Sequence, residues 1–372
     1  MDKPVIIVSA INIFEGGALT VLKECLNALN NNFSNEYHIE VFVYQKSLFN
    51  NDHFNNIKFN ELPKSRKSWF YRLFYEYFFF NRVSKEIKPI LWLSLHDTTP
   101  ILQTGIKQCV YCHNPSIFYN SSLSDFFYDK THVLFSLFYK FLYQINISKN
   151  DFVIVQQDWI RTKFSNLFKI PLSKILVAYP DSGEVSPANC EVFCPVKATF
   201  IYPAFPRIFK NYEIIINAAQ ILIDQGITDF EIKFTLSGVE NSYAKKIAKL
   251  SKSIPQIIFV GLMQRTMLLR EYTNTTALIF PSKLETWGLP ISEFKTLNKT
   301  ILLADLEYAH ETLGTYDKAC FFNSEDAKDL ATKMASLILN GPHTVWQNTT
   351  QQAPEYPFTT SWKEMLHLVL SH

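Results

Sequence analysis

Short runs of β-branched and aromatic residues alternate with amphipathic helical stretches along nearly the whole chain. This alternation is typical of βαβ units, in which parallel strands are joined through helices. A doubly wound α/β architecture with parallel sheets is therefore expected. The chain has 372 residues, which is enough for two such domains.

The expected elements form two series. In the first series, strands are predicted at 4–10, 38–45, 57–62, 90–95, 108–112, 152–156 and 174–179, and helices at 18–30, 66–87, 125–147 and 158–168. In the second series, strands are predicted at 198–203, 230–237, 257–261, 277–281 and 300–304, and helices at 211–225, 241–252, 265–273, 288–298 and 325–340.

A segment without apolar periodicity separates the two series and predicts a linker at 181–196. An N-terminal domain is accordingly expected at 1–180 and a C-terminal domain at 197–345. The tail at 346–372 ends in an amphipathic pattern that predicts one more helix, and this tail is expected to return to the N-terminal domain.

Composition excludes several classes of protein. Lys and Arg (36) nearly balance Asp and Glu (34), whereas nucleic-acid binders usually carry a strong basic excess. No apolar run approaches the length of a membrane span, and the N-terminal apolar run lacks a cleavage site, so a cytoplasmic location is expected.

The six cysteines are expected to be reduced, buried thiols. Cys109 and Cys112 followed by His113 have the spacing of a covalent haem site, but haem attachment normally requires export. Cys109, Cys112, Cys190 and Cys194 could form a zinc set, but no other ligand residues accompany the second pair. Neither a metal nor another cofactor is expected.

The segment 280–293, FPSKLETWGLPISE, follows an apolar strand and leads into a helix. Pro290 suits the first turn of that helix, whose free N–H groups favour phosphate or polar hydroxyl groups. Glu285 precedes the helix and Glu293 lies one turn inside it, so both carboxylates could bind vicinal hydroxyls of a sugar or ribose. A helix cap at Glu285 and a solvated Glu293 are equally compatible with the spacing.

Other segments at the ends of predicted strands carry candidate ligands. Arg207 and Lys210 flank a predicted helix start, where they could neutralise a diphosphate or be exposed surface cations. Gly16 and Gly17 would allow a ligand to approach the backbone closely. Asp97 could orient hydroxyls or stabilise a turn.

The segment 281–293 resembles the E-x7-E motif of retaining glycosyltransferases with the GT-B fold, particularly family 4, and matches it at every fixed position. The similarity continues through 301–314 and 319–323, with Asn298 and Lys299 in place of the usual small residue and Gly. The resemblance implies two facing Rossmann-like domains with a cleft between them and a nucleotide sugar bound mainly to the second domain.

The resemblance also implies roles for individual residues. Arg207 and Lys210 would hold the donor diphosphate and stabilise the leaving group, Glu285 would bind sugar hydroxyls, and Glu293 would bind the ribose. His113 would contact the donor sugar, and Asp97 would face the acceptor. Further donor contacts are expected from the residues at the helix start and in the glycine loop: Thr286, Trp287, Gly288, Leu289, Gly16 and Gly17.

The implied reaction is metal-independent transfer of a hexosyl group from a nucleoside-diphosphate sugar to a glycan hydroxyl, with retention at the anomeric carbon. Segments around 90–120 resemble bacterial enzymes of surface-polysaccharide and O-antigen assembly, which suggests mannosyl or related transfer. A nucleotide-sugar 2-epimerase of the same fold and a non-catalytic sugar-binding relative are the alternatives.

Residues 61–90 carry seven Lys and Arg against three Glu, with nine aromatic residues in the run WFYRLFYEYFFF. A basic aromatic helix can lie at a membrane interface, but its aromatic face can equally pack on a sheet. Membrane contact would place the protein on the inner face of the membrane and would favour a lipid-linked acceptor.

Overall fold

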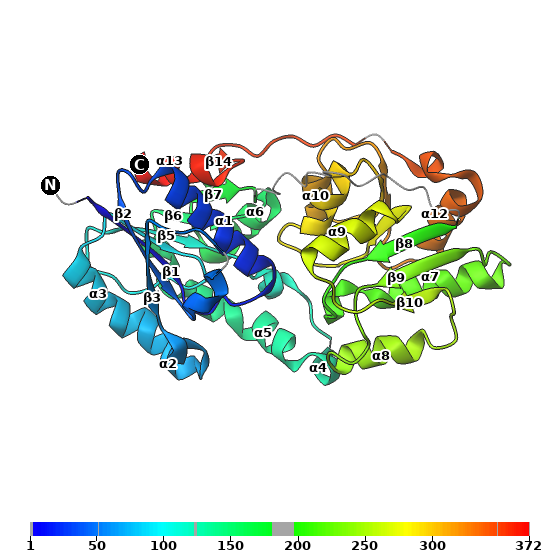
Figure 1. The fold of residues 1–372 in the computed structure, drawn as a ribbon, viewed down its shortest axis with the longest axis horizontal. Helices are drawn as coiled ribbons and strands as arrows, with labels where there is room; N and C mark the ends of the chain where they lie inside the picture. The colour runs from blue at the N-terminus through cyan, green and yellow to red at the C-terminus, as the bar shows by residue number, and fades with distance from the viewer. Residues whose placement is uncertain (1–2, 51, 123–124, 181–196, 348, 372) are drawn as a thin grey trace. The chain divides into compact units, whose positions relative to one another are not determined.

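The computed structural model describes residues 3–50, 52–122, 125–180, 197–347 and 349–371. The chain divides into two compact units (Figure 1). The first unit comprises Met1–Ile117, Phe138–Asp181 and Ala353–His372, and the second comprises Phe118–Leu137 and Ser182–Gln352. The expected linker at 181–196 lies outside the described residues.

The first unit contains an eight-stranded parallel sheet in the order β14-β7-β6-β5-β4-β1-β2-β3. Its strands are β1 (Val5–Ala10), β2 (His38–Val43), β3 (Ile57–Glu61), β4 (Leu91–Ser94), β5 (Lys107–Tyr111), β6 (Phe152–Val155), β7 (Ile175–Ala178) and β14 (Phe358–Thr359). Its longer helices are α1 (Gly16–Asn32), α2 (Trp69–Phe74), α3 (Phe80–Ile87), α6 (Asp158–Phe168) and α13 (Trp362–Ser371), and α5 (Lys130–Gln144) passes from the second unit into the first.

Strand β1 lies within this sheet and is buried on both faces because its side chains alternate between two apolar clusters. Ile6 and Val8 belong to one cluster, together with residues of α1 and α13. Ile7 belongs to the other cluster, which includes Phe80 of α3 and Trp92. Helices therefore cover both faces of the sheet, as expected for a doubly wound domain.

The second unit contains a six-stranded parallel sheet in the order β10-β9-β8-β11-β12-β13. Its strands are β8 (Ala198–Tyr202), β9 (Phe230–Phe234), β10 (Ile257–Phe259), β11 (Ala277–Phe280), β12 (Thr300–Ala304) and β13 (Ala319–Phe322). Its helices are α4 (Asp125–Tyr128), α7 (Tyr212–Asp224), α8 (Ser242–Leu250), α9 (Arg265–Thr273), α10 (Leu289–Thr296), α11 (Glu307–Leu313) and α12 (Ala327–Asn340). The expected fold class, with two Rossmann-like α/β domains, is confirmed.

Short 3₁₀ helices connect these elements: η1 (Lys46–Phe49), η2 (Pro63–Arg66), η4 (Pro115–Phe118), η5 (Ile147–Lys149), η6 (Leu172–Lys174), η7 (Ile208–Lys210) and η8 (Pro342–Val345). Helix α11 and strand β14 are absent from the sequence prediction. Strand β14 has only two residues, too few for a recognisable strand pattern. None of the described helices has the length and apolar character needed to cross a membrane.

The helix predicted at 66–87 begins later and contains a π-helical turn, η3 (Tyr75–Phe79), between α2 and α3. The wider turn changes the phase of the helix. Tyr75, Phe79 and Phe80 pack on the apolar cluster around Trp92, whereas Phe70 and Phe78 are 77% and 69% exposed. Packing of the aromatic face on the sheet is therefore confirmed for part of this run, and membrane contact stays a prediction.

The helix predicted at 125–147 is interrupted at Asp129. The Asp129 carboxylate accepts a hydrogen bond from the backbone N–H of His132 at 3.1 Å, which caps the start of α5. Residues 118–137 belong to the second unit, although the sequence pattern assigned them to the N-terminal domain. The alternation of strands and helices along the chain does not indicate that this segment belongs to the second unit.

The C-terminal residues from 353 onward belong to the first unit. Strand β14 pairs with β7 through Phe358 and Thr359. Trp362 of α13 stacks on Tyr111 of β5, with ring centroids 5.4 Å apart. The tail thus contributes an edge strand and a covering helix to the first sheet.

Candidate functional site

The order of the second sheet creates a topological switch point between β8 and β11, because the chain runs outward in one direction from β8 and in the other from β11. Ligands of doubly wound domains bind beyond the carboxyl ends of the strands at such a point. The loop after β8 carries Arg207 and Lys210, and the loop after β11 carries Glu285. The topology thus brings two segments predicted from sequence to the same edge.

Lys210 and Glu285 form an ion pair across this switch point, from Nζ to Oε1. The side chains are 15% and 14% exposed, so the pair is largely shielded but still reached by solvent. Such a cation can neutralise phosphate oxygens, and the carboxylate can accept hydrogen bonds from hydroxyl groups. The ion pair holds both groups in place while no ligand contacts them.

Backbone contacts fix the two loops that carry this pair. The Lys283 N–H donates to the Phe209 carbonyl at 2.7 Å. The Asn211 side-chain amide donates to the Pro281 carbonyl at 3.3 Å and to the Ser324 carbonyl at 2.9 Å. Asn211 has a left-handed backbone, with φ of 56°, which Asn tolerates better than most residues. The loops therefore form one rigid edge.

Gly288 shapes the start of α10 at this edge. Its φ is 84°, and a Cβ atom placed on it would lie 3.0 Å from Cδ1 of Ile291. The positive φ favours glycine, and a Cβ would require the Ile291 side chain to shift by a few tenths of an ångström. Gly288 has no side chain with which to cap the first N–H groups of α10, so this helix start can offer donors to a phosphate or hydroxyl. Thr286 and Trp287 precede the helix, and the Trp287 indole donates to Ser292 at 2.9 Å.

Arg207 contacts a residue that the sequence analysis did not single out. Its Nη1 lies 3.1 Å from each carboxylate oxygen of Asp129. The Arg207 side chain is 41% exposed, whereas that of Asp129 is 6% exposed. His132, one turn after Asp129, packs on Phe209 with ring centroids 4.7 Å apart. Residues 118–137 therefore build part of this site, although no motif marks them.

Glu293 occupies a separate, more buried position on α10. Its Oε1 lies 3.1 Å from Nη2 of Arg265, and its Oε2 accepts a hydrogen bond from the Tyr272 hydroxyl at 3.2 Å. Burial raises the pKa of Glu293 above its ordinary value, and Arg265 and Tyr272 oppose that rise. Arg265 and Tyr272 carry no motif that the sequence analysis could use.

Two expected ligands of the first unit, Asp97 and His113, are in direct contact. Asp97 accepts hydrogen bonds from the hydroxyls of Tyr139 and Tyr143 at 3.0 and 2.9 Å and from the backbone N–H groups of His113 and Asn114. With a φ of 71°, Asp97 sits in a tight turn. Of its two expected roles, these contacts favour stabilising the turn.

His113 is half-buried beside Asp97. Its Nε2 lies 2.7 Å from the Leu95 carbonyl oxygen. Because a carbonyl oxygen only accepts hydrogen bonds, Nε2 carries the proton. Burial lowers the pKa of His113, so the ring is neutral and Nδ1 is an acceptor. The ring can therefore accept a hydrogen bond from a ligand hydroxyl.

The glycine loop follows β1 at the switch point of the first sheet, which lies between β1 and β4. Gly16 and Gly17 are exposed at the start of α1. Gly16 has a φ of 67°, and nothing lies within 4 Å of the position of its missing Cβ. The loop thus leaves its backbone accessible to a ligand.

The described residues contain no group of three or more His, Cys, Asp or Glu side chains arranged to hold a metal ion. Cys109 and Cys112 are buried, and burial raises the pKa of Cys109 to about 12, which keeps it a thiol. Cys190 and Cys194 lie outside the described residues.

Comparison with known proteins shows which family the second domain is similar to. Residues 197–353 match the family model described as Glycosyl transferases group 1. The second domain is similar to this family over that range. The match includes every residue predicted for the second domain's site, from Arg207 to Glu293, so the switch-point pair lies within the region similar to this family.

The chain is also 22% identical over 246 residues to the O-antigen chain mannosyltransferase RfbU of Salmonella typhimurium. The aligned region covers 65% of this chain and 63% of that relative. The group 1 domain and this relative confirm the resemblance to GT-B glycosyltransferases of the bacterial surface-polysaccharide type.

Two solved structures illustrate the shared fold. A glycosyltransferase from Rickettsia africae has a TM-score of 0.68 and 15% identity, over 100% of this chain and 97% of that chain. HepE of Anabaena, in complex with UDP and glucose, has a TM-score of 0.61 and 12% identity, over 91% of each chain. These likenesses concern the fold.

Proposed function

We propose that the protein is a retaining glycosyltransferase that moves a hexosyl group from a nucleoside-diphosphate sugar to a glycan hydroxyl. The observation that carries this proposal is the Lys210–Glu285 pair at the switch point of the group 1 domain. A cation and a carboxylate at one edge suit a donor with a diphosphate at one end and sugar hydroxyls at the other.

In this proposal, Lys210 neutralises the negative charge that grows on the diphosphate as the glycosidic bond breaks. A fixed cation in a partly shielded site stabilises such charge more strongly than water does. Glu285 accepts hydrogen bonds from sugar hydroxyls and orients the reacting face. The N–H groups at the start of α10, near Gly288 and Leu289, add donors.

Other residues complete the proposed donor site. Arg207 turns from Asp129 to the diphosphate, and Glu293 binds the ribose. The donor contacts expected of Gly16, Gly17 and His113 in the first unit stay predictions. Two side-chain cations and a helix start supply the charge stabilisation that a metal ion provides in other transferases, which supports a metal-independent reaction.

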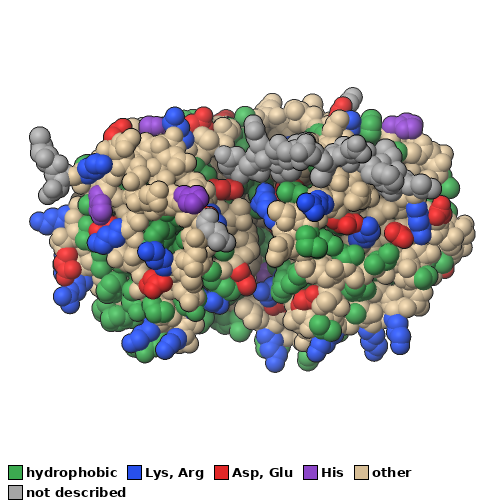
Figure 2. All heavy atoms as spheres, in the orientation of Figure 1, with side chains coloured by type: hydrophobic (Ala, Val, Ile, Leu, Met, Phe, Trp, Pro, Cys, Tyr) green, Lys and Arg blue, Asp and Glu red, His purple; other side chains and the backbone are tan. Residues whose placement is uncertain are grey.

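The similarity to an O-antigen chain mannosyltransferase supports mannose or a related hexose as the transferred sugar. A lipid-linked glycan is the proposed acceptor. Phe70, Phe74 and Phe78 are spaced four residues apart and are 77%, 45% and 69% exposed. Figure 2 shows hydrophobic side chains gathered over the α2–α3 segment, with Lys and Arg at the edge. This surface suits peripheral contact with an anionic membrane.

The first test is thermal unfolding of the protein with UDP, GDP, ADP and CMP and their sugar conjugates. One nucleotide class should raise the unfolding temperature, because a ligand at a hundred times its Kd stabilises the fold by about 2.7 kcal/mol. Lys210→Ala should abolish this shift and the transfer reaction. Lys233→Ala, which breaks a Lys–Glu pair of similar exposure on β9, is the control.

A Lys210→Ala protein that transfers sugar at the normal rate would refute the proposed role of this pair. The 2-epimerase alternative predicts conversion of the nucleotide sugar without any acceptor, whereas the transferase requires one. A protein that binds a nucleotide sugar but neither converts nor transfers it would be a non-catalytic relative.

A further inference from the structure

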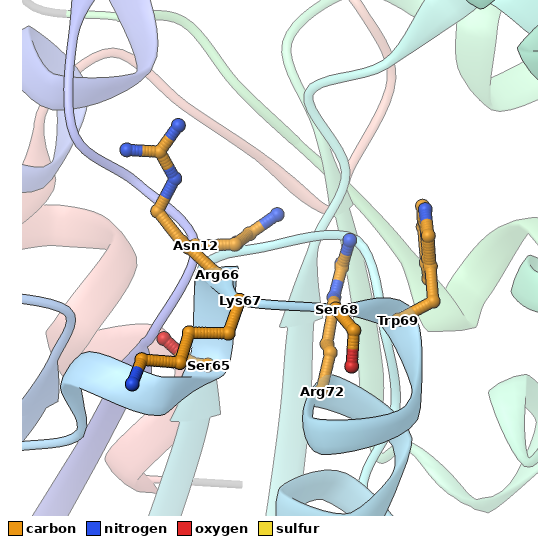
Figure 3. Close-up of a pocket in the computed structure, with 7 residues that line it drawn as sticks. All are labelled: Asn12, Ser65, Arg66, Lys67, Ser68, Trp69 and Arg72. Carbon is orange, nitrogen blue, oxygen red and sulfur yellow. The ribbon is translucent and has the colours of Figure 1, made fainter.

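The first unit contains a cationic pocket that none of the roles above uses. It is lined by Asn12, Ser65, Arg66, Lys67, Ser68, Trp69 and Arg72, and has a volume of about 330 Å³ (Figure 3). This volume lies at the lower end of the range for small-molecule sites. Three lining residues are cations and none is acidic, so the pocket favours an anion.

We propose that this pocket binds the phosphate or diphosphate group through which a lipid carries the glycan acceptor. The proposal rests on the proposed function and names the chemical class of the acceptor.

The pocket lies at the switch point of the first sheet. Asn12 follows β1 directly, and Ser65 donates a hydrogen bond to the Ile11 carbonyl, which ties η2 to that loop. Arg72 donates from Nη2 to the carbonyl of His96, just after β4, at 2.9 Å. Since β1 and β4 flank the switch point, the pocket occupies the position where doubly wound domains bind ligands.

Aromatic rings hold two of the cations. The Arg66 guanidinium lies 3.2 Å from the centroid of the Phe14 ring and 5.1 Å from that of Tyr44. The Arg72 guanidinium lies 4.8 Å from the Trp69 ring. Stacked guanidinium groups keep their N–H edges free for phosphate oxygens. Two binding groups of the pocket are therefore fixed in advance.

Arg72 provides the most specific signal for a ligand. It is 6% exposed, and no described residue accepts a hydrogen bond from its buried Nε. Buried donors normally have an acceptor. Glu76 lies within electrostatic range of Arg72, but its Oε1 contacts His96 and it does not line the pocket. A phosphate oxygen in the pocket would supply the missing acceptor.

The exposed aromatic surface of Phe70, Phe74 and Phe78 begins directly after the pocket-lining residues Ser68 and Trp69. An amphiphile can bind such a junction with its phosphate in the cationic pocket and its hydrocarbon beside the aromatic rings. This adjacency favours a lipid-borne phosphate over a free one.

The first experiment titrates inorganic diphosphate into Lys210→Ala protein, in which the proposed donor site is disabled, and measures heat of binding. Adding Arg66→Ala should weaken binding about tenfold, as expected for loss of a charge-assisted contact. Lys64→Ala removes an exposed cation of η2 that does not line the pocket, and should leave the affinity unchanged. Equal affinity with and without Arg66 overturns the proposal.

Arg72→Gln in the same background should weaken binding at least as much. If circular dichroism shows that this variant does not fold, the Arg66→Ala titration still tests the proposal, because Arg66 is exposed. Failure of this proposal and failure of the proposed function give different results. If the proposed donor site is wrong, Lys210→Ala protein binds UDP or GDP as the unchanged protein does, and this outcome does not depend on the Arg66 and Arg72 variants.

A second arm distinguishes the source of the phosphate by sedimentation with phosphatidylcholine vesicles, with and without phosphatidic acid. Preferential binding to phosphatidic acid that Arg66→Ala weakens and inorganic diphosphate displaces supports a lipid-borne phosphate. Diphosphate binding to the pocket without any vesicle preference would overturn the lipid source and assign the pocket to a soluble phosphate ester.

Discussion

Lys210 and Glu285 form an ion pair although 75 residues separate them in the chain. The pair exists because β8 and β11 are neighbours in the second sheet, so the loops that follow them meet at one edge. In the proposed reaction, Lys210 faces the diphosphate and Glu285 faces the sugar. Substitutions of the two residues should therefore have different effects.

Glu285→Gln should lower kcat/KM for transfer at least about tenfold, because a charge-assisted hydrogen bond to the sugar is lost. Binding of the nucleoside diphosphate alone should stay the same or tighten, because Lys210 is released from its partner. Calorimetry with the nucleoside diphosphate and steady-state kinetics measure the two effects. A parallel loss of nucleoside-diphosphate affinity would contradict the proposed division of roles.

Gly288→Ala should disturb the start of α10 and weaken donor binding. The substitution forces a left-handed backbone on alanine and places Cβ 3.0 Å from Ile291, which together cost about 1–3 kcal/mol of stability. Chemical denaturation and donor titration measure this change. Gly226→Ala is the matched control, because Gly226 has a φ of 80° but no atom within 4 Å of the added Cβ. Equal effects of the two substitutions would show that the close packing at Gly288 is unimportant.

Asp129→Asn should strengthen binding of the nucleoside diphosphate several-fold. The Asp129 carboxylate holds Arg207 at 3.1 Å and so competes with the diphosphate for the same cation. The Asn oxygen can still cap α5 at His132, so the fold should be preserved. Calorimetric titration tests this, with salt held constant. Weaker binding would mean that Asp129 orients Arg207 rather than competing for it.

The stability of the second unit should depend on the protonation of His132. Burial lowers the pKa of His132 from 6.5 to about 4. The folded state therefore favours the neutral ring, and the stabilisation is complete above pH 6.5 and is lost as the pH falls toward 4, by an amount on the order of 3 kcal/mol. His132→Phe, which keeps a ring against Phe209, should flatten this part of the unfolding profile.

NMR titration of the His132 ring measures the same property directly. Its signals should remain those of a neutral imidazole down to about pH 5, because the folded-state pKa is about 4. A midpoint near 6.5 would contradict the burial argument, whatever the unfolding profile shows.

Phe70→Ser combined with Phe78→Ser should reduce binding to anionic vesicles, because both side chains are mostly exposed and contribute little to the core. Leu339→Ser removes an apolar side chain of α12 that is 65% exposed, and should leave vesicle binding unchanged. Sedimentation with vesicles measures both. An equal effect of the two replacements would argue against a specific membrane surface at α2–α3.

Local sequence patterns were sufficient to predict part of the fold and part of the candidate site. Alternating apolar runs and helical stretches located most strands of both sheets, because each strand needs only its own short apolar run to be recognised. The segment 281–293 revealed Glu285, Gly288 and Glu293 together, since their spacing is set within one loop and one helix.

Contacts between residues that are distant in the chain could not be predicted from such patterns. Asp129 contacts Arg207 across 78 positions of the chain. The segment that contains Asp129 belongs to the second unit, although the segments before and after it belong to the first. The cationic pocket likewise depends on the hydrogen bond from Arg72 to the loop after β4. Such contacts follow from strand order and packing, which bring together residues whose local sequences contain no shared signal.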